Sequence, residues 1–138
     1  MTGNARPIPN PPGGIYGTRP NVGSYFVYVV TTTSGTIDTT NSDTAALAGI
    51  AVTKTATETG RYTFTARCTH LKLLVVNITP IGPADAAWGA NTTGLAHFIR
   101  NDAIASAGTF DVQFAQASDA DAELPDGAGF LAEVVVQG

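Results

Sequence analysis

Short segments in which apolar and polar residues alternate, set between turn residues, constrain the fold of this 138-residue chain more than any other feature. The alternation is clearest in RYTFTAR, residues 61–67, and in TFDVQFAQA, residues 109–117. Because successive side chains of a strand point to opposite faces of a sheet, this pattern indicates strands with one buried face. The side chains predicted to be buried are Tyr62, Phe64, Ala66, Phe110, Val112 and Phe114.

Five further segments are rich in β-branched or aromatic residues and end at Gly, Pro, Asn or Asp, which is typical of strands. They are residues 24–33, 51–59, 70–81, 95–102 and 129–137. Pro80 and Pro83 are expected to end the strand over residues 70–81, and Asn101-Asp102 indicates a turn. The alanine-rich middle of 39–52 predicts one helical turn. The chain is therefore predicted to be all-β, a β-sandwich or jelly-roll-like domain of about 7–8 strands.

The front of the chain has a different composition. NARPIPNPPGGIYGTRPN, residues 4–21, contains five prolines. Proline fixes its own φ, lacks an N–H donor and disfavours helix at the preceding residue, so neither a helix nor a central strand is expected here. We predict an extended, polyproline-like arm over residues 1–22, followed by the β-sandwich domain over residues 23–138. Such an arm is either a disordered tail or a segment that becomes ordered on a neighbouring molecule.

The charges restrict the class of partner. Only 13% of residues are charged and the net charge is −4, so nucleic acid is not an expected partner, because binding to it depends on Lys and Arg contacts with phosphates. The arm carries Arg6 and Arg19 and no acid, whereas residues 110–138 carry six acids and no base. The longest nearly apolar run, residues 71–81, is too short to span a bilayer, so no membrane partner is expected. The chain opens without a secretory signal, which predicts synthesis in the cytoplasm.

Few residues could carry chemistry. Cys68 and His70 are two residues apart in a predicted strand and could form half of a zinc site, but a single cysteine and two histidines do not complete the usual set of four ligands. The alternative is a small buried Cys68 beside a histidine at a strand edge. The segment 119–126 alternates carboxylates as calcium loops do, but Phe130 occupies the place of the final glutamate. It is either a solvated acidic turn or a looser calcium site.

Motifs for nucleophilic catalysis and for phosphate binding are absent from the sequence, so we expect no enzyme activity and no cofactor. Trp88 lies in a predicted loop beside Gly89 and Asn91. An exposed indole in such a loop could stack on a sugar ring or fill an apolar hollow at an interface. Trp88 is therefore a candidate contact residue.

The order of segments over residues 50–138 resembles small β-sandwich proteins of tailed-bacteriophage virions. In that group a Gly-x-Tyr strand is followed by an apolar strand, and here Gly60, Arg61 and Tyr62 precede HLKLLVVNITPI. The group also closes with an acidic Pro-Asp-Gly loop and a β-rich end, matched here by residues 122–127 and the final strand. These motifs carry no catalytic or ligand signature, so the resemblance implies no particular functional residue.

The resemblance implies a virion structural protein: a head decoration (cement) protein that binds the major capsid protein, commonly as a homotrimer on the outer surface of the phage head. The alternative within the group is a fibre or tail-tip module that binds host polysaccharide. A secreted adhesin and a small hydrolase remain further alternatives. If the chain is a decoration protein, the arm is the expected shell contact, since twenty extended residues reach about 65 Å. Its candidate contact residues are Arg6, Pro7, Pro9, Pro11, Pro12, Tyr16 and Arg19.

Overall fold

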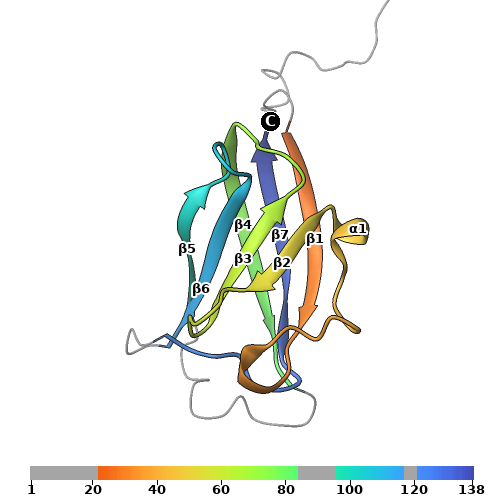
Figure 1. Ribbon diagram of the computed structural model, residues 1–138, viewed down its shortest axis with the longest axis vertical. Coiled ribbons are helices and arrows are strands. Elements are labelled where there is room, and N and C mark those ends of the chain that lie inside the picture. Colours follow the sequence, from red (N-terminus) through yellow and green to blue (C-terminus); the bar gives the residue numbers. More distant parts are fainter. Residues whose placement is uncertain (1–21, 84–95, 117–120) are drawn as a thin grey trace, which may run out of the picture.

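A computed structural model describes residues 22–83, 96–116 and 121–138. These residues form two antiparallel sheets, which confirms the predicted all-β sandwich (Figure 1). The three-stranded sheet has the order β1 (Val22–Val30), β7 (Gly129–Gln137), β4 (Lys72–Ile81). The four-stranded sheet has the order β2 (Ile50–Lys54), β3 (Arg61–Ala66), β6 (Thr109–Ala115), β5 (Ala96–Ala103). The predicted helical turn is α1 (Ala45–Ala48), and a short 3-10 turn covers Thr33–Gly35.

Aromatic side chains from both sheets meet in the core between them. Phe130 of the three-stranded sheet is fully buried, and its ring centroid lies 5.4 Å from that of Tyr62 and 5.5 Å from that of Phe114 in the opposite sheet. Phe64 lies 6.2 Å from Phe130 and stacks on Phe110. All six side chains that the alternation assigned to the interior are buried. The pattern in β3 and β6 therefore identified six of the sixteen buried residues of the described core.

The chain passes from one sheet to the other between β1 and β2, β3 and β4, β4 and β5, and β6 and β7. As a result, β4 and β5 are edge strands on one side of the sandwich (Figure 1). On the other side, residues 37–43 cover the free edge of β1 at its C-terminal end. The amide of Asp43 donates to the Tyr28 carbonyl at 2.8 Å, and the Asp43 carboxylate accepts from the Tyr28 amide at 2.9 Å.

β4 ends at Ile81, as predicted, and Pro80 lies within its ladder opposite Phe130. An edge strand tolerates proline, because the missing N–H can fall on the side without a neighbour. The turn predicted at the Asn101–Asp102 pair was wrong. β5 continues through it to Ala103 with a register shift, and the reversal follows at residues 104–108, where the Gly108 amide donates to the Ala103 carbonyl.

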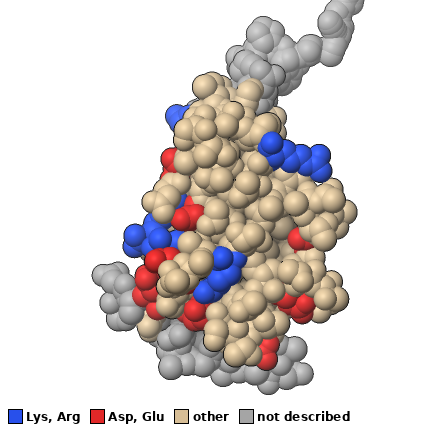
Figure 2. Space-filling view, in the orientation of Figure 1, with Lys and Arg blue, Asp and Glu red and all other residues tan. Residues whose placement is uncertain are grey.

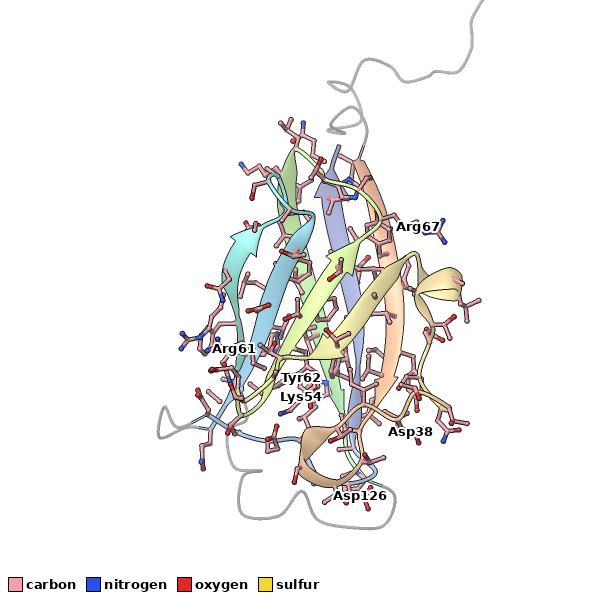
Figure 3. All side chains as sticks on the ribbon, viewed as in Figure 1. Asp38, Lys54, Arg61, Tyr62, Arg67 and Asp126 are labelled. Carbon is pink, nitrogen blue, oxygen red and sulfur yellow. The ribbon has the colours of Figure 1, made fainter. Side chains whose placement is uncertain are left out.

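The predicted acidic turn is present at Pro125–Gly127, where Asp126 is exposed, but Glu123 of the same segment has partners within the chain. Ala122 and Leu124 are buried, and between them Glu123 accepts a 2.7 Å hydrogen bond from the Gly60 amide. Lys54 forms a 3.2 Å ion pair with Glu123, and Figure 3 shows Lys54 and Tyr62 together at this end of the sandwich. Burial and the nearby Glu123 charge raise the pKa of Tyr62, so its hydroxyl keeps the proton that it donates to a backbone carbonyl. Glu123 therefore links the turn at Gly60 to the segment that precedes β7.

Candidate interaction surface

The outward side of the three-stranded sheet is apolar, and we call it the outer face. Its side chains follow from the register, in which Phe26 pairs with Glu133, Tyr28 with Leu131 and Thr79 with Leu131. Phe26 is 63% exposed and Leu131 is 47% exposed. The apolar members of the outer face are Val22, Phe26, Tyr28, Val75, Leu131 and Val135. A sheet that packed only on its own core would carry polar residues at these positions.

A single carboxylate lies in the middle of the outer face. Glu133 belongs to the central strand β7 and is flanked in register by Phe26 on β1 and Asn77 on β4. It accepts a 2.9 Å hydrogen bond from the Asn77 side-chain amide. Around it lies an open groove of about 690 Å³, bordered by the aromatic rings of β1 and by Asp43. The outer face thus combines a wide apolar area with one central charge.

The outward side of the four-stranded sheet is polar by contrast. Asp111 is buried there and accepts hydrogen bonds from Thr63 at 2.8 Å and from Asn101 at 2.9 Å. Arg61 donates to the Gln113 side chain at 2.9 Å and forms a 3.2 Å ion pair with a glutamate. Figure 2 shows basic and acidic side chains next to one another over this side of the molecule. Asp111 and Arg61 thus have partners within the chain, and this side is more polar than the outer face, although Phe98 of β5 is exposed on it.

The edge strand β5 is a second unusual surface, here called the β5 edge. Phe98 is 41% exposed and Ile99 is 37% exposed, although Ile99 lies opposite the fully buried Val112. The Arg100 guanidinium lies 5.1 Å from the centroid of the Phe98 ring, a cation–π arrangement. Phe98 and Arg100 lie on the outward side of the four-stranded sheet, opposite Gln113 and Asp111, and the exposed Asp102 lies on the same strand.

His97, at the beginning of β5, makes stability depend on pH. The His97 ring lies 6.2 Å from that of Phe114, and partial burial there lowers the pKa of His97 below its ordinary value of about 6.5, although the residue as a whole is exposed. Below about pH 6.5 the unfolded chain thus binds a proton that the folded chain resists, so stability falls as the pH drops through this range. Because solvent screens most of this effect at an exposed site, we expect His97→Gln to reduce the loss of melting temperature between pH 7.5 and pH 5 by only about 1 °C. Thermal unfolding at both pH values checks this, and an unchanged pH dependence would contradict it.

The proposed half-site for zinc is only partly assembled. Cys68 is exposed, which corrects the buried alternative, and its sulfur lies 3.9 Å from Nε2 of His70. The hydroxyl of Tyr25 lies 2.7 Å from the same nitrogen. Burial raises the pKa of Tyr25, so its hydroxyl keeps its proton, and the Tyr25–His70 hydrogen bond engages the nitrogen that a metal would need. Within residues 22–83, 96–116 and 121–138, no three His, Cys, Asp or Glu side chains are grouped to hold a metal ion.

Several sequence-based candidates lie outside the described residues. The arm residues Arg6, Pro7, Pro9, Pro11, Pro12, Tyr16 and Arg19 precede β1, and Trp88 falls between β4 and β5. Their assignment as contact residues stays a prediction. Of the acidic segment 119–126, the described part begins at Asp121, and its Glu123 is committed to Gly60 and Lys54. The outer face was not singled out from the sequence, although apolar residues at both odd and even positions of β1 carried a signal for it.

The described geometry defines an all-β sandwich with one polar face and one apolar face. Among the described residues, no helix is long and apolar enough to cross a membrane. The chain matches no protein-family model, and comparisons with curated proteins and with solved structures give no significant match. The function therefore has to be argued from the surfaces themselves.

Proposed function

We propose that this chain is a non-enzymatic structural protein of a bacteriophage virion, a decoration protein that binds the outer surface of the head as a homotrimer. The observation that carries the proposal is the outer face, where Phe26 and Leu131 remain largely exposed. Burial of apolar surface contributes about 25 cal/mol per Å². Contiguous apolar patches on soluble proteins mark sites of interaction with other molecules. The outer face supports assembly, and the polar opposite face supports exposure to water.

In this proposal the arm and the sandwich domain have different binding roles. The sandwich forms the trimer, and the arm of each copy contacts the major capsid protein. β1 begins at Val22, so the arm joins the sandwich at the end where Val22 pairs with Gln137 (Figure 1). Three arms held in one trimer bind with a combined strength far above that of one arm, because attachment of the first raises the effective concentration of the others. Such contacts bridge neighbouring capsid subunits and reinforce the shell.

Deletion of residues 1–21 tests the arm. The truncated protein keeps every described strand, since β1 begins at Val22. We expect it to fold and to form the same oligomer. We expect it to bind phage heads at least about a hundredfold more weakly, because all three arms of the trimer are lost. Co-sedimentation with purified heads measures the binding, and light scattering measures the oligomer. Undiminished binding by the truncated protein would contradict the role of the arm.

The mass in solution tests the trimer. One copy has a mass of 14.1 kDa, so a trimer scatters light as a particle of three times that mass. A trimer that sediments with heads supports the decoration function, whereas a trimer that ignores heads contradicts it. The result with heads therefore separates assembly from attachment.

The groove on the outer face favours one other function, a fibre or tail-tip module that binds host-surface polysaccharide. Tyr28 and Phe26 supply aromatic surface, and Asp43, Asn77 and Glu133 supply hydrogen-bonding groups around the same groove. Sugar rings are bound by aromatic stacking together with such polar groups. A glycan array would show binding that is lost in Tyr28→Ala or in Trp88→Ala. Glycan binding without head binding would replace the decoration function by this one.

A further inference from the structure

We propose that the end of the sandwich from which the arm leaves binds an acidic surface of the protein that the arm contacts, so that the domain stands with this end towards the shell. We call it the arm end. Its exposed side chains include Arg67, Leu71 and Lys72. The inference rests on the proposed function and deepens it, because it adds a second contact with the shell and states the chemistry of the surface contacted.

The strand register places these residues at the arm end. Lys72 pairs with Gln137, and Gln137 pairs with Val22 at the start of β1. Arg67 belongs to the connection between β3 and β4, and Figure 3 shows it towards this end of the sandwich. Arg19 precedes β1 by three residues, which span about 10 Å when extended, so a partner that holds Arg19 is also close to the arm end. The arm and the arm end can therefore meet one partner together.

The bases of the arm end are available to a partner. Among the ion pairs of the described residues, none includes Arg67 or Lys72. The Arg67 guanidinium makes a 3.5 Å hydrogen bond to a backbone carbonyl, which leaves its other N–H groups for a partner. Asp102 is the one described acid beside Lys72, and its carboxylate accepts a 3.1 Å hydrogen bond from the Ile104 amide. Leu71 is 69% exposed and borders an open groove of about 290 Å³. With the two arginines of the arm, this end of the molecule carries four bases and one acid.

The opposite end of the sandwich has the reverse charge. The described acids in its turns and loops are Asp38, Asp43, Glu58, Asp121, Glu123 and Asp126. Its two bases are already paired, because Lys54 lies 3.2 Å from Glu123 and an ion pair of the same length joins Arg61 to a glutamate. The four aspartates take part in none of the ion pairs of the described residues, and Figure 3 shows Asp38 and Asp126 at this end. Charge is therefore separated along the length of the domain.

This separation determines which kind of surface the domain meets and in which orientation. An acidic surface attracts the arm and the arm end and repels the opposite end, whereas a basic surface would hold the domain the other way round. The charges between the two ends, which are Arg100, Asp111 and Glu133, do not reverse the difference. Arginine binds carboxylates through paired hydrogen bonds, and Leu71 adds an apolar contact beside the bases. The outer face extends between the two ends, so it remains available for contacts among copies.

Removal of two charges at the arm end tests the contact in the full-length protein. We expect the double variant Arg67→Gln with Lys72→Gln to bind purified phage heads at least about fivefold more weakly than the unmodified protein in about 50 mM NaCl. In about 500 mM NaCl the difference is expected to fall below about twofold, because salt screens exposed charges. Co-sedimentation measures binding at both salt concentrations, and circular dichroism checks that the variant folds.

The matched control changes the net charge by the same amount at the opposite end. Thr36→Glu with Ala56→Glu adds two negative charges at exposed positions in the turns there. The nine residues of β1 separate the ends by about 30 Å, which exceeds the screening length of about 15 Å in this salt. We expect the control to bind heads within about twofold of the unmodified protein. A loss equal to that of the arm-end variant would mean that net charge alone controls attachment, and it would overturn the contact.

The outcomes separate the inference from the proposed function. If the unmodified protein does not bind heads, both fail. If it binds through the arm but the arm-end variant binds equally well, or remains weak in about 500 mM NaCl, the second contact is overturned while the proposed function stands. Nucleic acid is the other acidic partner, although four bases neutralise few phosphates. The unmodified protein is expected not to bind duplex DNA in about 50 mM NaCl, and DNA binding that the arm-end variant loses would overturn the assignment of a protein surface.

Discussion

Replacement of Phe130 by alanine is expected to lower the free energy of unfolding by about 3–5 kcal/mol. The Phe130 ring is fully buried and contacts Tyr62, Phe64 and Phe114 of the opposite sheet. Its removal leaves a cavity where the two sheets meet, and β7, the strand that carries Phe130, is paired on both sides and cannot move in to fill it. Since small domains are stable by only about 5–15 kcal/mol, the variant loses a large part of its stability.

Urea denaturation measures the loss as a lower midpoint at an unchanged slope. Leu47→Ala is the control, because Leu47 in α1 is 77% exposed and its truncation is expected to change stability by less than about 0.5 kcal/mol. Both variants are compared at one protein concentration, so that assembly does not affect the difference. If Phe130→Ala unfolds at the same midpoint as Leu47→Ala, the two sheets do not pack on each other as described.

Gly60→Ala is expected to cost about 3 kcal/mol or more, enough to leave much of the chain unfolded. Gly60 adopts a φ of +65°, which side chains disfavour, and a Cβ placed there would meet the Ala122 carbonyl oxygen. The backbone cannot shift easily, because the Gly60 amide donates to Glu123 and its carbonyl accepts from Phe114 at 2.8 Å. The strain and the clash therefore add to the loss of these hydrogen bonds.

Gly23→Ala provides the matched control, since a Cβ at Gly23 meets no atom within 4 Å and its φ is ordinary. We expect this variant to be as stable as the unmodified protein or slightly more stable, because alanine restricts the unfolded chain. Thermal unfolding of the two variants side by side is the measurement. Equal melting temperatures for Gly60→Ala and Gly23→Ala would show that the turn at Gly60 is not held as described.

Sequence reasoning succeeded where one face of a strand is buried and the other meets water. In β3, polar Arg61, Thr63 and Thr65 separate the buried residues, so the two-residue period of a strand could be recognised in the sequence. It failed where the outcome depended on contacts between segments distant in the sequence. Asn101–Asp102 stays within β5, which pairs with β6 as far as Ala103, and Glu123 could not be assigned before Gly60 and Lys54 were brought beside it.

The candidate surface was harder to predict than the fold. VGSYFVYVV, the sequence of β1, is apolar on both faces, as expected either for a strand covered on both sides within one chain or for one covered by a partner. Only the layer arrangement shows that one of these faces lies outside. The arm and Trp88 remain predictions, since they lie outside the described residues. The sequence did show that β1 is apolar at both odd and even positions, whereas β3 alternates between polar and apolar residues.

The pairing of Val22 with Gln137 has a mechanical consequence. A pull between the arm and the end of β7 acts on two neighbouring antiparallel strands at the same end of the sheet. Their hydrogen bonds run perpendicular to the strands, so the load falls on one pair at a time and opens the ladder like a zipper. A pull on the arm against a body held along its whole outer face instead shears many of these bonds together. The same tether is thus weak or strong according to where the rest of the domain is anchored.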